Sequence, residues 1–205
     1  MRVMDETEVA RLSAPAVILA SASARRMQLL WQIGVPHRAL AAGLDERRGA
    51  LEPIERCVVR LAEQKALRVQ GISGTTLPVM GADTAVVIDG EMLGKPRDRA
   101  AGLAMLERLS GRTHAVLSAV ALVSPGGVRS ALSRSEVRFR RLAAAECAAY
   151  WDSGEPCDKA GGYAIQGVGA TFIEELRGSY SGVMGLPLFE TAALLAEAGV
   201  SVWRS

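Results

Sequence analysis

The sequence predicts an α/β fold with a mixed sheet that contains both parallel and antiparallel strands. One observation is a strand, loop and helix unit at residues 17–33, which is typical of α/β proteins. The other is a pair of hairpin patterns, at residues 79–93 and 113–139, and hairpins form antiparallel strand pairs. Together they argue against a wholly parallel, doubly wound sheet.

The first half of the chain supplies the strand, loop and helix unit and the first hairpin. Short apolar runs predict the strands, and apolar residues recurring on one face predict the helices. Gly34 is expected to end the first helix, and the dipeptide Asp89–Gly90 is a typical two-residue hairpin turn. The expected elements are strands at 17–20, 79–88 and 91–93 and helices at 25–33 and 55–69.

The second half continues with helices on either side of a longer hairpin. Gly111 is expected to stop the first helix of this half, and the glycines after Pro125 form the hairpin turn. Residues 154–185 are rich in glycine around one short strand. The expected elements are helices at 97–109, 143–151 and 187–198 and strands at 113–123, 129–139 and 171–176.

Composition narrows the class of protein. The chain has 205 residues, 49% of them hydrophobic, which is enough to build a core. Its 24 basic and 22 acidic residues give a net charge of +2, so no broad cationic surface for nucleic acid is expected. The apolar stretch at 115–123 is too short to span a membrane, and the acidic start of the chain lacks the apolar run of a secretory signal.

The cysteines indicate a reducing compartment. Cys57, Cys147 and Cys157 are odd in number and form no C-x-x-C pair, which argues against a disulfide framework and against a zinc site. We therefore expect a cytoplasmic protein.

The segment from Ser21 to Arg26 lies where a strand gives way to a helix N-terminus. Free backbone N–H groups at such a place favour an anion, and Arg25 and Arg26 would strengthen the site. The alternative is a serine that caps the helix, followed by two solvated arginines.

Three further charged residues stand out in the first half of the chain. Asp45 and Glu46 form a carboxylate pair that is either a solvated loop or part of a site for a hard divalent cation. Lys65 falls within the apolar face of its helix. Its ammonium either extends to the edge of the core or reaches a phosphate in a cleft.

Asp83 interrupts a strand that is otherwise apolar on both faces. A buried carboxylate without partners costs several kcal/mol, roughly, so it must be paired, bound to metal or able to accept a proton. Extending the hairpin register from the Asp89–Gly90 turn places Thr84 opposite Lys95 and Asp83 opposite Pro96. Glycine or proline after the return strand is able to break that ladder.

Residues 155–167 combine charges, glycines and the amide of Gln166. Glycine lets backbone approach a ligand, and an amide offers both a donor and an acceptor to a base edge. The same composition also suits an ordinary surface loop. His37 and His114 build no triad with a G-x-S-x-G serine, and the chain has no P-loop.

Taken in order and spacing, these segments resemble the Maf family of nucleotide pyrophosphatases from Ile18 to about Gly199. The departures are Ala24, where proline is usual, and Ala164, where glycine is common. The matching segments are Leu19 to Ser21, Arg25–Arg26, Asp45–Glu46, Ala62 to Ala66, Gly81 to Thr84, Gly94 to Pro96, Leu109 to Gly111, Asp158 to Gly167 and Gly185 to Leu188.

The resemblance implies a mixed sheet flanked by helices, two lobes around a deep cleft, a fold like that of inosine triphosphate pyrophosphatases, and a homodimer. It implies hydrolysis of dTTP, UTP or modified pyrimidine nucleoside triphosphates to the monophosphate and pyrophosphate. One domain is expected at 16–205 after an extension at 1–15. The rival function is a nucleotide-binding regulator linked to cell division.

The resemblance also assigns roles to residues. Asp83 matches the proton acceptor, and Arg25, Thr84 and Gln166 match the positions that separate the dTTP/UTP branch from a branch acting on 7-methyl-GTP. Other polar cleft positions match Ser21, Arg26, Glu46, Lys65, Lys95 and Lys159. We expect Glu46 and Asp83 to hold a divalent metal (Mg, Mn or Co), with Lys65 and Lys95 stabilising charge, and we expect Lys65, Lys95 and Arg25 to surround Asp83.

Overall fold

The computed structural model describes residues 14–202, so most of the expected extension at 1–15 lies outside the described residues. The seven strands are β1 (Val17–Leu19), β2 (His37–Ala39), β3 (Val79–Ile88), β4 (Glu91–Leu93), β5 (Thr113–Ser124), β6 (Gly127–Phe139) and β7 (Ile173–Arg177). The α-helices are α2 (Ala24–Gln32), α3 (Ile54–Ser73), α4 (Arg99–Leu109), α5 (Ala144–Asp152), α6 (Tyr180–Met184) and α7 (Leu188–Glu197). Three short 3₁₀ helices follow α5, at Glu155–Asp158, Ala160–Gly162 and Val168–Phe172.

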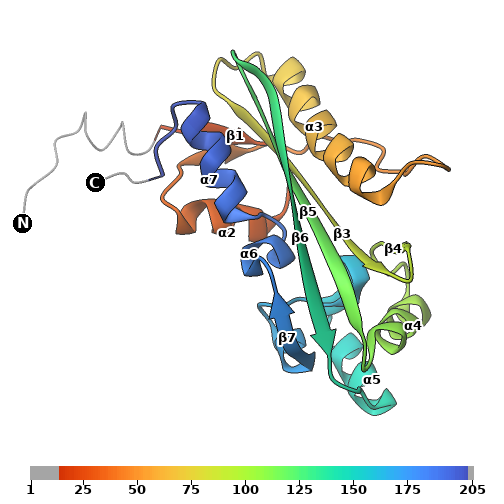
Figure 1. The fold of residues 1–205 in the computed structure, drawn as a ribbon. Helices are drawn as coiled ribbons and strands as arrows, with labels where there is room; N and C mark the ends of the chain where they lie inside the picture. Colours follow the sequence, from red (N-terminus) through yellow and green to blue (C-terminus); the bar gives the residue numbers. More distant parts are fainter. Residues whose placement is uncertain (1–13, 203–205) are drawn as a thin grey trace, which may run out of the picture.

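The sheet is mixed, as predicted. Its strand order is β2-β1-β3-β5-β6-β7, with β4 also paired to β3. β1 is parallel to β2 and β3, and the other pairs are antiparallel. Helices α2 and α7 cover one face of the sheet and α3 covers the other (Figure 1). Helices α4 and α5 pack further along the long strands, on a cluster that includes Val86, Val116 and Val137.

The edge of β3 is divided between two short strands. β1 pairs with Val79 and Met80, whereas β4 pairs with Val86 to Ile88. Residues 81–85 between them have no strand partner on that edge in the described part of the chain. The loops that follow β1 and β4 therefore border a stretch of unpaired strand edge between the two ends of the molecule (Figure 1).

The predicted turn is present, but the predicted hairpin register does not reach the charged residues. Asp89 and Gly90 have φ of 54° and 73°, the left-handed values that a two-residue hairpin turn requires. The ladder ends at the pair Val86 and Leu93, so Thr84 does not face Lys95 and Asp83 does not face Pro96. The residues after Leu93 leave the sheet, and Thr84 is aligned with Ser118 of β5 instead.

Other boundaries differ from the prediction where the sequence signal is short. Helix α3 continues past Val69 to Ser73 and ends at Gly74, whose φ of 59° suits a helix terminus. Strand β2 and helix α6 were not predicted, because three and five residues are too few for periodicity to appear. None of the described helices is both long and apolar enough to cross a membrane.

Gly81 allows α3 to lie against β3. A Cβ on Gly81 would overlap the carbonyl oxygen of Ala62 and lie 2.8 Å from the amide nitrogen of Ala66, both backbone atoms of α3. We expect Gly81→Ala to lower the free energy of unfolding by about 1–3 kcal/mol or more, measured by urea denaturation, because backbone must move. Gly71→Ala is the matched control, since nothing lies within 4 Å of its added methyl group. It should gain about 0.5–1 kcal/mol from helix propensity, and equal losses in both variants would contradict the packing argument.

Candidate active site at the edge of β3

Lys65, Asp83 and Glu46 form one charged cluster. Gly81, Asp83 and Ala85 alternate onto the face of β3 that α3 covers, and Lys65 lies on the buried side of α3. Lys65 Nζ donates to Asp83 Oδ1 at 2.6 Å and lies 2.8 Å from Glu46 Oε1. Lys65 is 7% exposed and Asp83 is 8% exposed. The lysine therefore pairs with a carboxylate instead of extending its ammonium to solvent.

Burial sets the acidity of Asp83. Desolvation raises the pKa of Asp83 above its usual value, although Lys65 and Arg26 act in the opposite direction. Asp83 Oδ1 accepts from Lys65, whereas Oδ2 accepts no hydrogen bond from any described residue. A carboxylate that is more basic than usual and has one uncommitted oxygen is suited to accept a proton.

Arg26 joins three segments that are far apart in the chain. Its Nε donates to the carbonyl of Gly185 at 2.8 Å, Nη1 donates to Ser21 Oγ at 3.3 Å, and Nη2 donates to Thr84 Oγ1 at 3.4 Å. Desolvation lowers the pKa of Arg26, and the charges of Asp83 and Glu46 partly offset this effect. The alternative of a serine cap with solvated arginines is wrong here, because the N-cap residue Ser23 makes no side-chain cap hydrogen bond and Arg26 is held by the fold.

Arg25 and Lys159 meet at a residue that sequence reasoning did not select. Arg25 Nη1 lies 4.0 Å from Asp158 Oδ2, and Lys159 Nζ forms an ion pair with the same carboxylate. Desolvation lowers the pKa of Arg25 despite the charge of Asp158. Asp158 thus links the first turn of α2 to the glycine-rich segment, and the sequence placed it at the start of the matching segment Asp158 to Gly167 without a role of its own.

Lys95 and Gln166 are exposed, and within residues 14–202 neither side chain makes a hydrogen bond or ion pair. The loop of Lys95 nevertheless contacts the glycine-rich segment, since Gly161 N donates to the carbonyl of Gly94 at 3.0 Å. The expected ring of Lys65, Lys95 and Arg25 around Asp83 is therefore incomplete. Lys65 contacts Asp83, and the arginine that acts on it electrostatically is Arg26.

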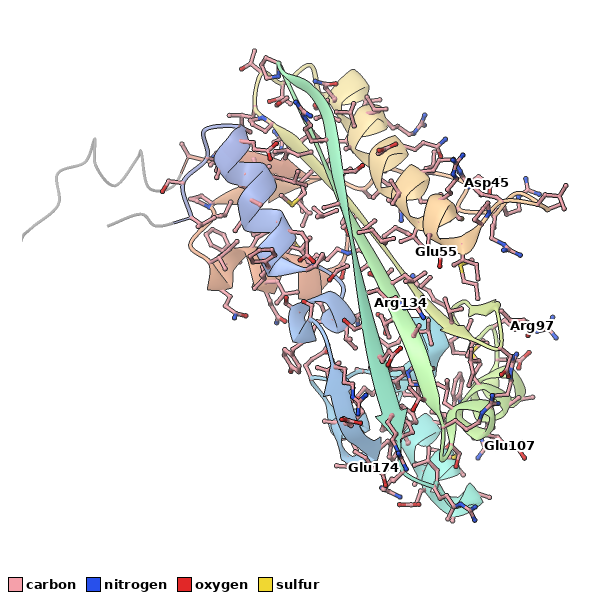
Figure 2. The ribbon with its side chains drawn as sticks, in the orientation of Figure 1. Asp45, Glu55, Arg97, Glu107, Arg134 and Glu174 are labelled. Atoms are coloured by element: carbon pink, nitrogen blue, oxygen red, sulfur yellow. The ribbon has the colours of Figure 1, made fainter. Side chains whose placement is uncertain are left out.

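Asp45 does not belong to the cluster. Its carboxylate pairs with Arg47 at 2.7 Å. Figure 2, where Asp45 is labelled, shows it on the outer side of the loop before α3. Of the acidic pair predicted from sequence, only Glu46 points to Lys65.

The carboxylates of Glu46 and Asp83 have the chemistry of a small hard-cation site. They already share one cation, the Lys65 ammonium, so they are close enough to share another. Across the described residues no group of three or more metal-ligating side chains occurs. Mg²⁺ is often bound by two carboxylates, while water and phosphate oxygens fill its remaining coordination positions.

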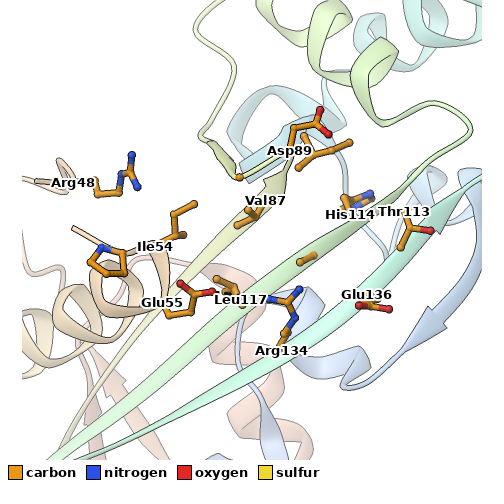
Figure 3. Close-up of a pocket in the computed structure, with 14 residues that line it drawn as sticks. Arg48, Ile54, Glu55, Val87, Asp89, Thr113, His114, Leu117, Arg134 and Glu136 are labelled. Carbon is orange, nitrogen blue, oxygen red and sulfur yellow. Dashed lines mark ion pairs between the residues drawn. The ribbon is translucent and has the colours of Figure 1, made fainter. Parts of the chain in front are cut away.

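A separate groove lies at the N-terminus of α3. Its volume is about 580 Å³, and Figure 3 shows Ile54, Val87 and Leu117 at its centre with Arg134 and Glu136 beside them. Neither Asp83 nor Lys65 lines it. The groove is thus distinct from the charged cluster.

Comparison with known proteins identifies the family. The sequence profile described as Maf-like protein matches residues 16–198. The chain belongs to the Maf family. Among curated Maf relatives named dTTP/UTP pyrophosphatase, that of Alkalilimnicola ehrlichii is 52% identical over 93% of this chain and 96% of its own length. Those of Saccharophagus degradans and Methylococcus capsulatus are 48% and 50% identical, over 91% and 92% of this chain and 90% and 93% of their own lengths.

Two solved structures superpose weakly on this Maf chain. The Ham1 protein of Staphylococcus aureus has a TM-score of 0.40 and 12% identity, over 60% of this chain and 71% of its own. A nucleoside-triphosphatase named dITP/XTP pyrophosphatase from Mycobacterium abscessus also has a TM-score of 0.40. It is 18% identical, over 89% of this chain and 95% of its own. The mixed α/β fold is shown by the strand order and pairing of this chain.

Proposed function

We propose that this protein hydrolyses dTTP and UTP to the nucleoside monophosphate and pyrophosphate. The names of its Maf relatives support this substrate class. The observation that carries the proposal is the buried Lys65 ammonium between Asp83 and Glu46, beside the unpaired edge of β3. Such a cluster suits a reaction that depends on positioning and charge.

Asp83 acts as the general base in this proposal. Its free Oδ2 accepts a proton from water while the water oxygen forms a bond to the α-phosphorus. The bond from the α-phosphorus to the bridging oxygen breaks, and pyrophosphate leaves with that oxygen. Lys65 stabilises the developing charge, and Arg25, Lys95 and Lys159 bind the phosphates from the surrounding loops. Ser21 and Arg26 hold the β1–α2 loop and also face the phosphate site.

Glu46 and Asp83 would hold a divalent cation, Mg, Mn or Co. When bound, such a cation neutralises charge on the triphosphate and polarises its oxygens. A carboxylate fully engaged by metal is a poor base, so the two roles of Asp83 are alternatives. Lys65 supports either one, because it holds Oδ1 and leaves Oδ2 for the second partner.

Gln166 reads the pyrimidine in this proposal, and Thr84 and Arg25 set the size of the pocket and orient the nucleotide. Gln166 offers its amide to the edge that uracil and thymine share, which also allows modified pyrimidine nucleotides. The Thr84 hydroxyl interacts with Ser118 at 3.0 Å and accepts from Arg26, so it acts by fixing the wall of the site.

We also propose a homodimer that works in the cytoplasm on a small-molecule substrate, without nucleic acid or membrane. Support for the compartment comes from three free cysteines, two of them buried. The division into an extension at 1–15 and one domain at 16–205 stays a prediction. A regulator linked to cell division is not favoured, because the relatives are named as pyrophosphatases.

Pyrophosphate release from a nucleotide panel tests the proposal. With Mg²⁺ or Mn²⁺ present, we expect dTTP, UTP, 5-methyl-UTP and pseudo-UTP to be hydrolysed at least about tenfold faster than 7-methyl-GTP in kcat/KM, since a hydrogen-bonding site discriminates strongly. Faster turnover of 7-methyl-GTP would overturn the base assignment. Tight nucleotide binding without pyrophosphate release would instead support the regulator.

A further inference from the structure

The segment that carries Gln166 contains only short 3₁₀ helices and the loops between them. Gln166 lies between two 3₁₀ helices, Ala160–Gly162 and Val168–Phe172. Such a segment needs other bonds to hold one conformation, because short 3₁₀ turns stabilise it little. Those bonds converge on Glu155 and Tyr150.

Glu155 ties the residues that follow Gln166. Its Oε2 accepts from Val168 N at 2.9 Å, and its Oε1 accepts from Gly169 N at 3.1 Å and from the Tyr150 hydroxyl at 2.8 Å. Desolvation raises the pKa of Glu155, but these hydrogen bonds lower it more. The pKa of Glu155 therefore lies below the usual value. The carboxylate is therefore charged at neutral pH, when its bonds to N–H donors are strongest.

Tyr150 ties the residues before Gln166. Its hydroxyl accepts from Ala164 N at 3.0 Å while donating to Glu155. Its ring is buried and packs edge-on against Phe172, with centroids 4.9 Å apart. Since Tyr150 belongs to α5, both flanks of Gln166 are anchored through one phenol and one carboxylate to a regular helix.

The glycines of the segment fit this arrangement. A Cβ on Gly167 would overlap the Glu155 carboxylate, and one on Gly169 would lie 2.7 Å from the Tyr150 hydroxyl. The backbone just after Gln166 thus approaches the two side chains more closely than any larger residue would permit. The exposed Gln166 amide itself is left for a ligand.

We propose that Glu155 and Tyr150 are positioning residues that hold the Gln166 amide in place for recognition of the pyrimidine base. The inference rests on the proposed function. It separates two tasks of the site, because Lys65 and Asp83 act on the phosphates from α3 and β3, whereas Glu155 and Tyr150 act on the base through Gln166. A purely structural role predicts general damage to the loop instead.

The test measures binding of α,β-methylene UTP and α,β-methylene GTP by calorimetry. Glu155→Gln removes an acceptor from the N–H donors, and Tyr150→Phe removes only the hydroxyl and keeps the packed ring. We expect each variant to bind the UTP analogue about tenfold more weakly, which is the effect of one good hydrogen bond. The affinity for the GTP analogue should change less than about twofold. Glu174→Gln is the matched control, a carboxylate on β7 that pairs with Arg138, and it should change neither.

Combination with Gln166→Ala decides between positioning and general damage. If Glu155 acts through the Gln166 amide, Glu155→Gln should lower the affinity for the UTP analogue less than about twofold in a Gln166→Ala background. An undiminished tenfold loss in that background, or equal loss for both analogues, overturns the inference. Failure of the proposed function would appear in the wild-type protein, as absent pyrophosphate release from UTP, so the two failures are distinguishable.

Discussion

The Asp83→Asn variant is expected to lose about 10²- to 10⁴-fold in kcat for dTTP and UTP, the usual contribution of a general base. Asparagine keeps the shape of the side chain and still offers an oxygen to Lys65, but it cannot take the proton of the attacking water. Pyrophosphate release at saturating substrate measures the effect. Asp152→Asn, at an exposed carboxylate on α5 that pairs with Arg99, is the control and should retain full turnover.

The same substitution should not destabilise the fold. Because burial raises the pKa of Asp83, its contribution to stability is fully present below the unfolded pKa near 3.8 and is lost as the pH rises through the folded pKa. Asparagine does not titrate, and Lys65 keeps Glu46 as its counter-ion, so the variant should be at least as stable as the wild type at pH 7. That advantage should shrink as the pH falls, when followed by urea denaturation across the pH range. A variant that keeps most of its turnover would refute the role of Asp83.

The Lys65→Met variant should lose both stability and activity. Removing the ammonium leaves Asp83 and Glu46 without the cation that contacts both, and breaking a buried ion pair costs about 3 kcal/mol or more. Urea denaturation at pH 7 measures the loss. Lys95→Met is the matched control for stability, since Lys95 is exposed, and it should stay within about 0.5 kcal/mol of the wild type.

A double variant identifies the source of that loss. Lys65→Met combined with Asp83→Asn removes the uncompensated charge, so most of the stability should return while turnover stays absent. Equal destabilisation of the single and double variants would show that the methionine harms packing instead of exposing a charge.

The sequence predicts those elements whose signals are local. The Asp89–Gly90 turn specified the β3–β4 hairpin, and the apolar stripe of α3 placed Lys65 on the buried face. The pattern could not say which way Asp83 points, because β3 is buried on both faces and a period of two then carries no information. The contact with Lys65, 18 residues away, supplied that direction.

Contacts between segments far apart in the chain could not be predicted from the sequence. Arg26 donates to the carbonyl of Gly185, 159 residues away, and a backbone oxygen leaves no mark in the residue pattern. Thr84 was expected to lie opposite Lys95, but extrapolating a hairpin fails where the strand ends, and Gly94 contacts Gly161 instead of continuing the ladder. The family resemblance named Gln166, but it did not reveal what anchors the loop around it.

The three long strands have a mechanical consequence. β3, β5 and β6 run without a break from the helices α2, α3 and α7 to the helices α4 and α5, joined by continuous antiparallel ladders (Figure 1). A hinge requires a flexible connection, and a paired ladder is stiff because bending it breaks several hydrogen bonds at once. The two ends of the molecule are therefore connected rigidly by these three strands. We expect them to unfold in a single transition, and we expect adjustment to a ligand to occur in the loops beside the unpaired edge of β3.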